Sequence, residues 1–322
     1  MKKLSWFGVR CLFASAMLAG VSGSAFANNV AARVEGSLLV VAGDNLANQI
    51  VISRSAAGDV IVTGQNGTLV NGKASERFPR LQLNAAEILM GGGNDVLTLR
   101  GLQISNDLFV NLGDGADRLV APAAAPVTVG ANVSIEGASG NDTIRTEGLL
   151  VGQDYYIDGG IGVLTATILN STVGFNVTVI GDDANDVVTL TQVAAGGEIS
   201  VETKGGSDRV TMTTITSLLL AVSTDANALI GADRVSLMDV TTLEDLGIFT
   251  GPGNDVVQMA DVASAKNIIV SADSGNDTVS GTSVFAELDA VFEGGAGTDR
   301  FEDFGITGGV KLEIKEFEVF AP

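Results

Sequence analysis

A 22-residue period runs through most of this 322-residue chain and constrains its fold more than any other feature. A short phrase of Gly, one variable residue and Asp recurs along the chain, and the steps between successive copies are 22, 25, 22, 22, 22, 25, 22, 22 and 22. Its copies end at Asp95, Asp117, Asp142, Asp186, Asp208, Asp233, Asp255, Asp277 and Asp299; the copy at Asp186 has Ala184 in place of Gly, and one degenerate copy keeps only Gly162. Repetition of this kind predicts a solenoid, in which each repeat is one structural unit stacked on the next.

Hydrophobic residues keep the same phase. One column lies two residues after each Asp, from Leu97 to Phe301, and a second lies seven residues before it, from Ile88 through Ala226 to Phe292. A weaker third column consists of Leu102, Leu149, Val193, Ile215, Val240, Val262, Val284 and Ile306. The residues around the first two columns alternate with period two, which predicts short strands with one face turned inward.

We therefore predict an all-β fold, a parallel β-helix solenoid of about ten 22-residue coils. One coil cannot bury its apolar side chains alone, so the coils must share a continuous interior. Residues 73–308 are expected to form the helix, because the repeat occupies them. Residues 28–72 contain short apolar runs separated by turn residues and are expected to form an N-terminal β-hairpin cap. Residues 309–322 are expected to form a capping strand over the last exposed edge.

Residues 1–27 have the order of a Sec-type signal peptide: a positively charged start, an apolar stretch from Cys11 to Val21, and Ala25-Phe26-Ala27 as a cleavage site. We expect a secreted, extracellular protein, with the periplasm or cell surface as other destinations. Cleavage would remove three of the 18 basic residues, none of the 38 acidic ones, and the single cysteine. The apolar stretch is too short to span a bilayer and no later run is long enough, so no membrane span is expected.

Composition excludes several functions. The chain has no histidine, which removes His-based catalysis and imidazole metal sites. A net charge of −20 argues against nucleic acid as a partner, because binding phosphates requires clustered Lys and Arg. No residues stand out as catalytic, so the sequence favours a protein that is not an enzyme.

The nine Asp residues of the repeat are the candidate metal ligands. In stacked coils they would lie about 5 Å apart, and repulsion between ionised neighbours would favour a bound cation such as calcium. Asp114, Asp182 and Asp183 could add ligands. The alternative is that Asp, together with the neighbouring Asn residues, only shapes the turns and forms a ladder without metal.

The segment Gly294-Gly295-Ala296-Gly297-Thr298-Asp299-Arg300-Phe301-Glu302 resembles one nonapeptide of the haemolysin-type calcium-binding (RTX) family. That resemblance implies calcium held between turns by Asp side chains and loop carbonyls. The other copies keep fewer residues of the nonapeptide motif. This chain also has one such turn per coil, whereas the family has nonapeptides in tandem. A coil of 22 residues instead resembles those of the larger parallel β-helices of secreted bacterial proteins, including polysaccharide lyases and surface adhesins.

Three functions follow. The first is a non-enzymatic, calcium-binding structural or surface/matrix protein, with calcium ions and cell-surface or matrix polysaccharide as partners. The second is a carbohydrate-active β-helix, with a groove between two 25-residue coils expected to bulge from one side at 121–126 and 213–220. The remote third is ice binding through the outward Thr98, Thr167, Thr189 and Thr211. Arg118, Arg209, Arg234 and Arg300, each following an Asp, are expected to neutralise carboxylates across coils.

Overall fold

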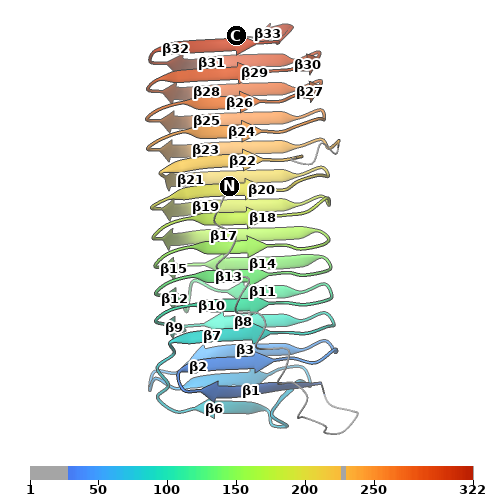
Figure 1. The fold of residues 1–322 in the computed structure, drawn as a ribbon, viewed down its shortest axis with the longest axis vertical. Helices are drawn as coiled ribbons and strands as arrows, with labels where there is room; N and C mark the ends of the chain where they lie inside the picture. Colours follow the sequence, from blue (N-terminus) through green and yellow to red (C-terminus); the bar gives the residue numbers. More distant parts are fainter. Residues whose placement is uncertain (1–27, 226–229, 322) are drawn as a thin grey trace.

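The computed structural model describes residues 28–225 and 230–321, with side chains to residue 318, and consists of β-strands stacked along one axis (Figure 1). The predicted signal peptide, 1–27, lies outside the described residues. In the described part of the chain, the strands form two long sheets and a pair of short strands, β27 (Ser274–Gly275) and β30 (Ala296–Gly297). The all-β parallel solenoid of about ten turns is confirmed.

The 14-stranded sheet has the order β32 (Lys311–Lys315), β29 (Asp289–Glu293), β26 (Ile268–Ser271), β24 (Leu246–Phe249), β22 (Leu219–Ser223), β20 (Glu198–Glu202), β18 (Val177–Ile180), β16 (Tyr155–Asp158), β13 (Val133–Glu136), β10 (Leu108–Asn111), β7 (Ala85–Leu89), β2 (Leu38–Ala42), β1 (Asn29–Glu35) and β5 (Leu69–Val70).

The 17-stranded sheet contains the other strands: β3 (Gln49–Arg54), β4 (Val60–Gly64), β6 (Ser75–Phe78), β8 (Val96–Arg100), β9 (Gln103–Ile104), β11 (Arg118–Ala121), β12 (Thr128–Val129), β14 (Asp142–Glu147), β15 (Leu150–Val151), β17 (Leu164–Val173), β19 (Val187–Ala195), β21 (Arg209–Ser217), β23 (Arg234–Thr242), β25 (Val256–Ser264), β28 (Thr278–Ala286), β31 (Arg300–Gly308) and β33 (Val319–Ala321).

Each regular coil contributes one short strand to the first sheet and one longer, bent strand to the second. In β19, Val188 and Leu190 point inward before the bend and Val193 after it, and all three are at most 1% exposed. The bend falls at Gln192, whose φ of 53° is left-handed, and the same position is left-handed in the neighbouring coils. The weak third hydrophobic column is therefore a real wall, because its eight residues are all buried beyond this bend.

The β-helix begins inside the segment predicted as its cap. Strands β2 and β3 pair in parallel with β7 and β8, and so already form a coil. Antiparallel partners β1 and β4 extend this coil, and β6 pairs antiparallel with β4. The two ends differ, because at the C-terminal end the last strands, β32 and β33, continue the stack in parallel on β29 and β31.

The two longer coils do not bulge from the same side, which corrects the sequence prediction. In the first long coil, paired residues of β8 and β11 are one regular period apart in the sequence, whereas paired residues of β9 and β12 are three residues further apart. The additional residues therefore lie between β11 and β12, as expected. In the second long coil, paired residues of β20 and β22 are one residue closer in the sequence than the regular period. Paired residues of β22 and β24 are four residues further apart than that period. The insertion therefore follows β22, at the Asp turn, and not at 213–220.

The position of this insertion also changes one member of a hydrophobic column. The sequence analysis placed Ala226 between Val201 and Ile248, but Val222 pairs with both of those residues and fills the place, with 0% exposure. Ala226 itself lies outside the described residues. Counting from the Asp failed here because the four added residues separate the Asp from its strand.

Candidate functional site

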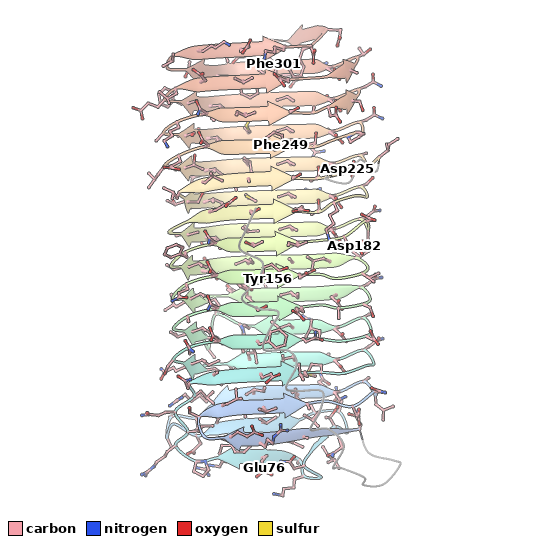
Figure 2. The ribbon with its side chains drawn as sticks, viewed as in Figure 1. Glu76, Tyr156, Asp182, Asp225, Phe249 and Phe301 are labelled. Carbon is pink, nitrogen blue, oxygen red and sulfur yellow. The ribbon has the colours of Figure 1, made fainter. Side chains whose placement is uncertain are left out.

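The repeated Asp residues lie at the corner where each strand of the 14-stranded sheet turns into the 17-stranded sheet. The labelled Asp182 and Asp225 mark this edge of the stack in Figure 2. All nine predicted ligands are between 0 and 2% exposed, so they line the inside of the corner. They are Asp95, Asp117, Asp142, Asp186, Asp208, Asp233, Asp255, Asp277 and Asp299.

Backbone hydrogen bonds hold these side chains in a ladder. The Oδ1 atom of each Asp after the first accepts the backbone N–H at the equivalent position one coil earlier, for example from Asp186 N to Asp208 Oδ1 at 2.7 Å and from Asp255 N to Asp277 Oδ1 at 2.8 Å. At the N-terminal end the donor is Asn48 N, and at the C-terminal end Glu318 accepts from Asp299 N. Each carboxylate thus satisfies a backbone donor, which is the turn-shaping role.

One residue divides the ladder in two. The degenerate repeat has Leu164 in place of Asp, and this side chain is fully buried. Its N–H still donates to Asp186 Oδ1 at 2.7 Å, but Asp142 N donates to the Val163 carbonyl instead of a carboxylate. The structure therefore brings together three Asp residues before Leu164 and six after it.

The second oxygen of nearly every ladder Asp has no well-formed hydrogen bond. Among the described residues, eight Oδ2 atoms are buried without a well-formed hydrogen bond, and the exception, Asp186 Oδ2, accepts from Asp182 N at 3.0 Å. A buried oxygen without a donor disfavours the charged carboxylate, because nothing replaces its lost hydration. Burial therefore favours a protonated side chain, or a carboxylate neutralised by a cation, over a bare carboxylate.

The pKa values follow from that burial. Desolvation is the largest cause of the raised pKa in eight of the ladder residues. It raises the pKa of Asp117 and Asp233, and it raises the pKa of Asp186 and Asp277 to about 6. The pKa values of Asp95, Asp142, Asp208 and Asp255 rise to about 7. Bonds from backbone amides act in the opposite direction, and neighbouring Asp carboxylates raise several of these pKa values further. The six carboxyls with pKa values of about 6 or 7 therefore take up protons in mild acid.

The Asn residues of the turns form a second ladder, which runs in the opposite sense on the outside of the corner. Asn94 Oδ1 accepts from Ala116 N at 2.9 Å and Asn254 Oδ1 accepts from Asn276 N at 2.8 Å, in each case from the following coil. Asn141, Asn185 and Asn276 make equivalent bonds. These amides connect successive turns through hydrogen bonds alone, as the turn interpretation predicts.

The three additional acidic residues contribute less than the sequence suggested. Asp114 accepts from Ser139 Oγ at 2.6 Å and adds to the rise in the pKa of Asp117, while Asp182 acts on Asp186 through its backbone N–H. Asp183 is exposed. None of the three belongs to a compact group of acidic side chains among the described residues.

Sequence reasoning missed Asp225. This residue is 3% exposed, and one of its carboxylate oxygens lies within 4.8 Å of oxygens from Asp208 and Asp233. These three form the one group of at least three potential metal-ligating side chains in the described parts of the chain. Asp225 lies eight residues before the repeated Asp233, so a search at fixed spacing does not find it.

A further polar ladder at the other end of the coil was also missed. Asn132 Nδ2 donates to Asp107 Oδ1, Asn176 Nδ2 to Asp154 Oδ1 and Asn267 Nδ2 to Asp245 Oδ1, at 2.8 to 2.9 Å. Asp107, Asn132, Asp154 and Asn176 follow one another in steps of 25, 22 and 22, so the repeat itself carried the signal. The hydrophobic columns drew attention away from it.

The expected neutralisation of carboxylates across coils by these Arg residues is wrong, because none of the four forms an ion pair with another coil among the described residues. Strand alternation points Arg118, Arg209, Arg234 and Arg300 outward, and all four are exposed. Arg300 pairs with Glu302 on its own strand, and Arg234 Nη2 donates to Gln258 Oε1 at 2.8 Å. Within the described residues, no Lys or Arg forms an ion pair with a ladder Asp.

The two tyrosines have different surroundings. Tyr155 is fully buried, and its hydroxyl lies 2.9 Å from Thr146 Oγ1, so it belongs to the core. Tyr156 lies on the outward face of the 14-stranded sheet, labelled in Figure 2, and donates to Asp158 Oδ2 at 3.0 Å. Of the two, only Tyr156 could contact a ligand from outside.

Comparison with models of protein families, with curated proteins and with solved structures found no match. In residues 28–225 and 230–321, no helix has the length and apolar character needed to cross a membrane.

Proposed function

We propose that this protein is a secreted, non-enzymatic β-helix that serves as a structural or surface/matrix interaction protein, and that calcium binds along its buried Asp ladder. The observation that carries the proposal is the row of Oδ2 atoms, buried without well-formed hydrogen bonds among the described residues, in a corner with raised pKa values. Calcium prefers oxygen ligands, and a cation would supply the charge compensation that no Lys or Arg of the described residues provides there.

The resemblance of Gly294–Glu302 to an RTX turn supports the choice of ion. Asp299 in that segment has the same arrangement as the rest of the ladder, with one oxygen accepting a backbone N–H at 2.8 Å and the other without a donor. An exported protein would also meet calcium outside the cell. Secretion rests on the Met1–Ala27 sequence.

Two features favour a structural role over carbohydrate chemistry. The additional residues of the two long coils belong to different corners, so they do not flank the common groove that the enzyme alternative requires. The outward Thr column is half-buried and interrupted, because Thr167, Thr189 and Thr211 are followed in register by Ser236 and Gln258, and this gives ice binding little support. The outer sheet faces are the surfaces that matrix or cell-surface polysaccharide would meet.

A thermal melt of the chain beginning at Asn28 tests the proposal. At neutral pH, calcium should raise the melting temperature relative to chelator, since a ligand at about 100 times its Kd adds about 2.7 kcal/mol of stability per site. In mild acid the difference should shrink, because protons compete for the same carboxylates. Identical melts and no heat of binding with millimolar calcium would refute calcium binding. Release of reducing or unsaturated sugars from acidic polysaccharides would instead support the enzyme alternative.

A further inference from the structure

The four-residue insertion after β22 changes the chemistry of the Asp corner at one level. Asp225 directly follows Thr224, the last buried residue before the corner in its coil. In the neighbouring coils the equivalent position is held by Lys204, Gly251 or Asp273. These residues and Asp225 all have left-handed φ angles, between 52° and 75°. Asp273 in the same place is exposed, whereas Asp225 is 3% exposed and turned toward the ladder.

We propose that Asp208, Asp225 and Asp233 form a discrete calcium site, with higher affinity than the rest of the ladder. This inference rests on the calcium binding proposed above and deepens it by locating the strongest site. Elsewhere a cation would meet a single file of carboxylates, one per coil. Here three carboxylates converge, one oxygen of each within 4.8 Å of the other two.

The hydrogen bonds leave one oxygen free on each of the three side chains. Asp208 Oδ1 accepts from Asp186 N and Asp233 Oδ1 from Asp208 N, both at 2.7 Å, while Asp225 Oδ2 accepts from Gly231 N at 2.8 Å. Among the described residues, the remaining oxygens, Asp208 Oδ2, Asp225 Oδ1 and Asp233 Oδ2, are buried without a well-formed hydrogen bond, although the Thr203 hydroxyl lies near Asp208 and the Thr224 hydroxyl near Asp233. One oxygen per residue is therefore fixed by the backbone, and one is available to a cation.

A separate observation points to a ligand at the same place. The Thr203 side chain is fully buried, and its Oγ1 lies near Asp208, where it lowers the pKa of that carboxyl without completing a well-formed hydrogen bond. A buried hydroxyl rarely remains without a partner. A cation bound by Asp208 would give the Thr203 oxygen a partner as well.

The charges around the cluster increase the need for a cation. Asp186 faces Asp208 from the preceding coil, and Asp233 adds to burial in raising the pKa of both Asp208 and Asp225. In the described residues no basic side chain pairs with any of the three. Three carboxylates held this close repel one another unless protons or a cation neutralise them.

The donor set selects calcium among common cations. Carboxylate and hydroxyl oxygens suit a hard ion, and histidine and thiol ligands are absent from this corner. Magnesium usually keeps several bound waters, but the free oxygens here are inaccessible to solvent. Calcium accepts an irregular set of side-chain and carbonyl oxygens, which stacked turns provide.

Calorimetric titration with calcium chloride at neutral pH tests the site in the chain from Asn28, using Asp225→Asn, Asp225→Gly and the matched control Asp273→Asn. Asn and Gly both tolerate the left-handed backbone at 225, so both variants should fold, and circular dichroism checks this. We expect the strongest site to weaken at least tenfold in both Asp225 variants and to stay unchanged in Asp273→Asn.

Each other outcome counts against the proposal. If the Asp225 variants bind calcium as the unmodified chain does, the site is refuted while ladder binding stands. If the unmodified chain binds no calcium, both proposals fail. Equal weakening in Asp273→Asn would attribute the loss to net charge instead of this cluster, and equal affinity for magnesium would overturn the choice of ion.

Discussion

Asp255→Asn separates the ionisation of one ladder residue from its hydrogen bonding. The Asp255 carboxyl is 1% exposed, its Oδ1 accepts from Asp233 N at 2.8 Å, and its Oδ2 has no well-formed hydrogen bond. An Asn at this position keeps an oxygen for the Asp233 N–H. Its amide nitrogen would occupy the place of the hydroxyl of a protonated Asp, so the two forms differ mainly in whether they can ionise.

The sign of the effect follows from the pKa. Burial, with the neighbouring Asp233 and Asp277 carboxylates, raises the pKa of Asp255 from 3.8 to about 7, against the opposing effects of Asp233 N and the nearby Thr250 hydroxyl. Between these values the folded chain holds a proton that the unfolded chain has lost, so stability is present in acid and falls as pH rises. The loss is at most about 1.4 kcal/mol per pH unit, or about 4 kcal/mol in total.

Urea unfolding without calcium, from about pH 4 to about pH 8, measures this difference. Near the acid end Asp255→Asn and the unmodified chain should have similar free energies of unfolding. The variant should then become progressively more stable in comparison, by up to about 4 kcal/mol near pH 8. Calcium at that pH should stabilise the unmodified chain more than the variant. The exposed Asp261→Asn, which also removes one charge, should show neither effect.

A constant difference between Asp255→Asn and the unmodified chain at every pH would refute this reasoning, because it would mean that packing and not ionisation sets the cost. An unmodified chain that becomes more stable as pH rises from acid to neutral, without calcium, would refute it as well.

Three further changes test the packing of the coils. Gly275→Ala should lower the melting temperature sharply and reduce soluble yield, because a Cβ there would overlap the Gly253 carbonyl oxygen. The same change at Gly36 should cost far less, because φ is positive at both residues, 148° and 64°, but Gly36 has open space around it. Equal losses would contradict the argument. Leu190→Ala should cost about 2 to 5 kcal/mol in urea unfolding, since the side chain is fully buried, and a loss below about 1 kcal/mol would show a loosely packed interior. Asn176→Ala should cost about 1 to 3 kcal/mol by removing a 2.9 Å bond to Asp154 and an acceptor for Glu198 N, and an unchanged unfolding midpoint would show that this ladder adds no stability.

The sequence predicted the architecture well because stacking repeats the same local requirement in every coil. The columns at Leu97 and Val110, like the weaker one at Val193, are buried as their spacing indicated. The spacing predicted less at the second long coil, where Val222 and not Ala226 fills the interior. A length count shows that a coil has additional residues, but only pairing with the coils above and below shows which corner holds them.

By itself, the sequence determined the period, the inward columns and the position of the Asp residues at a turn, because these depend on spacing along the chain. The tertiary structure alone decided how those carboxylates are used. Each Asp side chain turns inward because the backbone N–H of the preceding coil lies within its reach, and that donor is distant along the chain. Asp225 joins Asp208 and Asp233 for the same reason: coils distant along the chain are adjacent in the stack, and their register sets which oxygens meet.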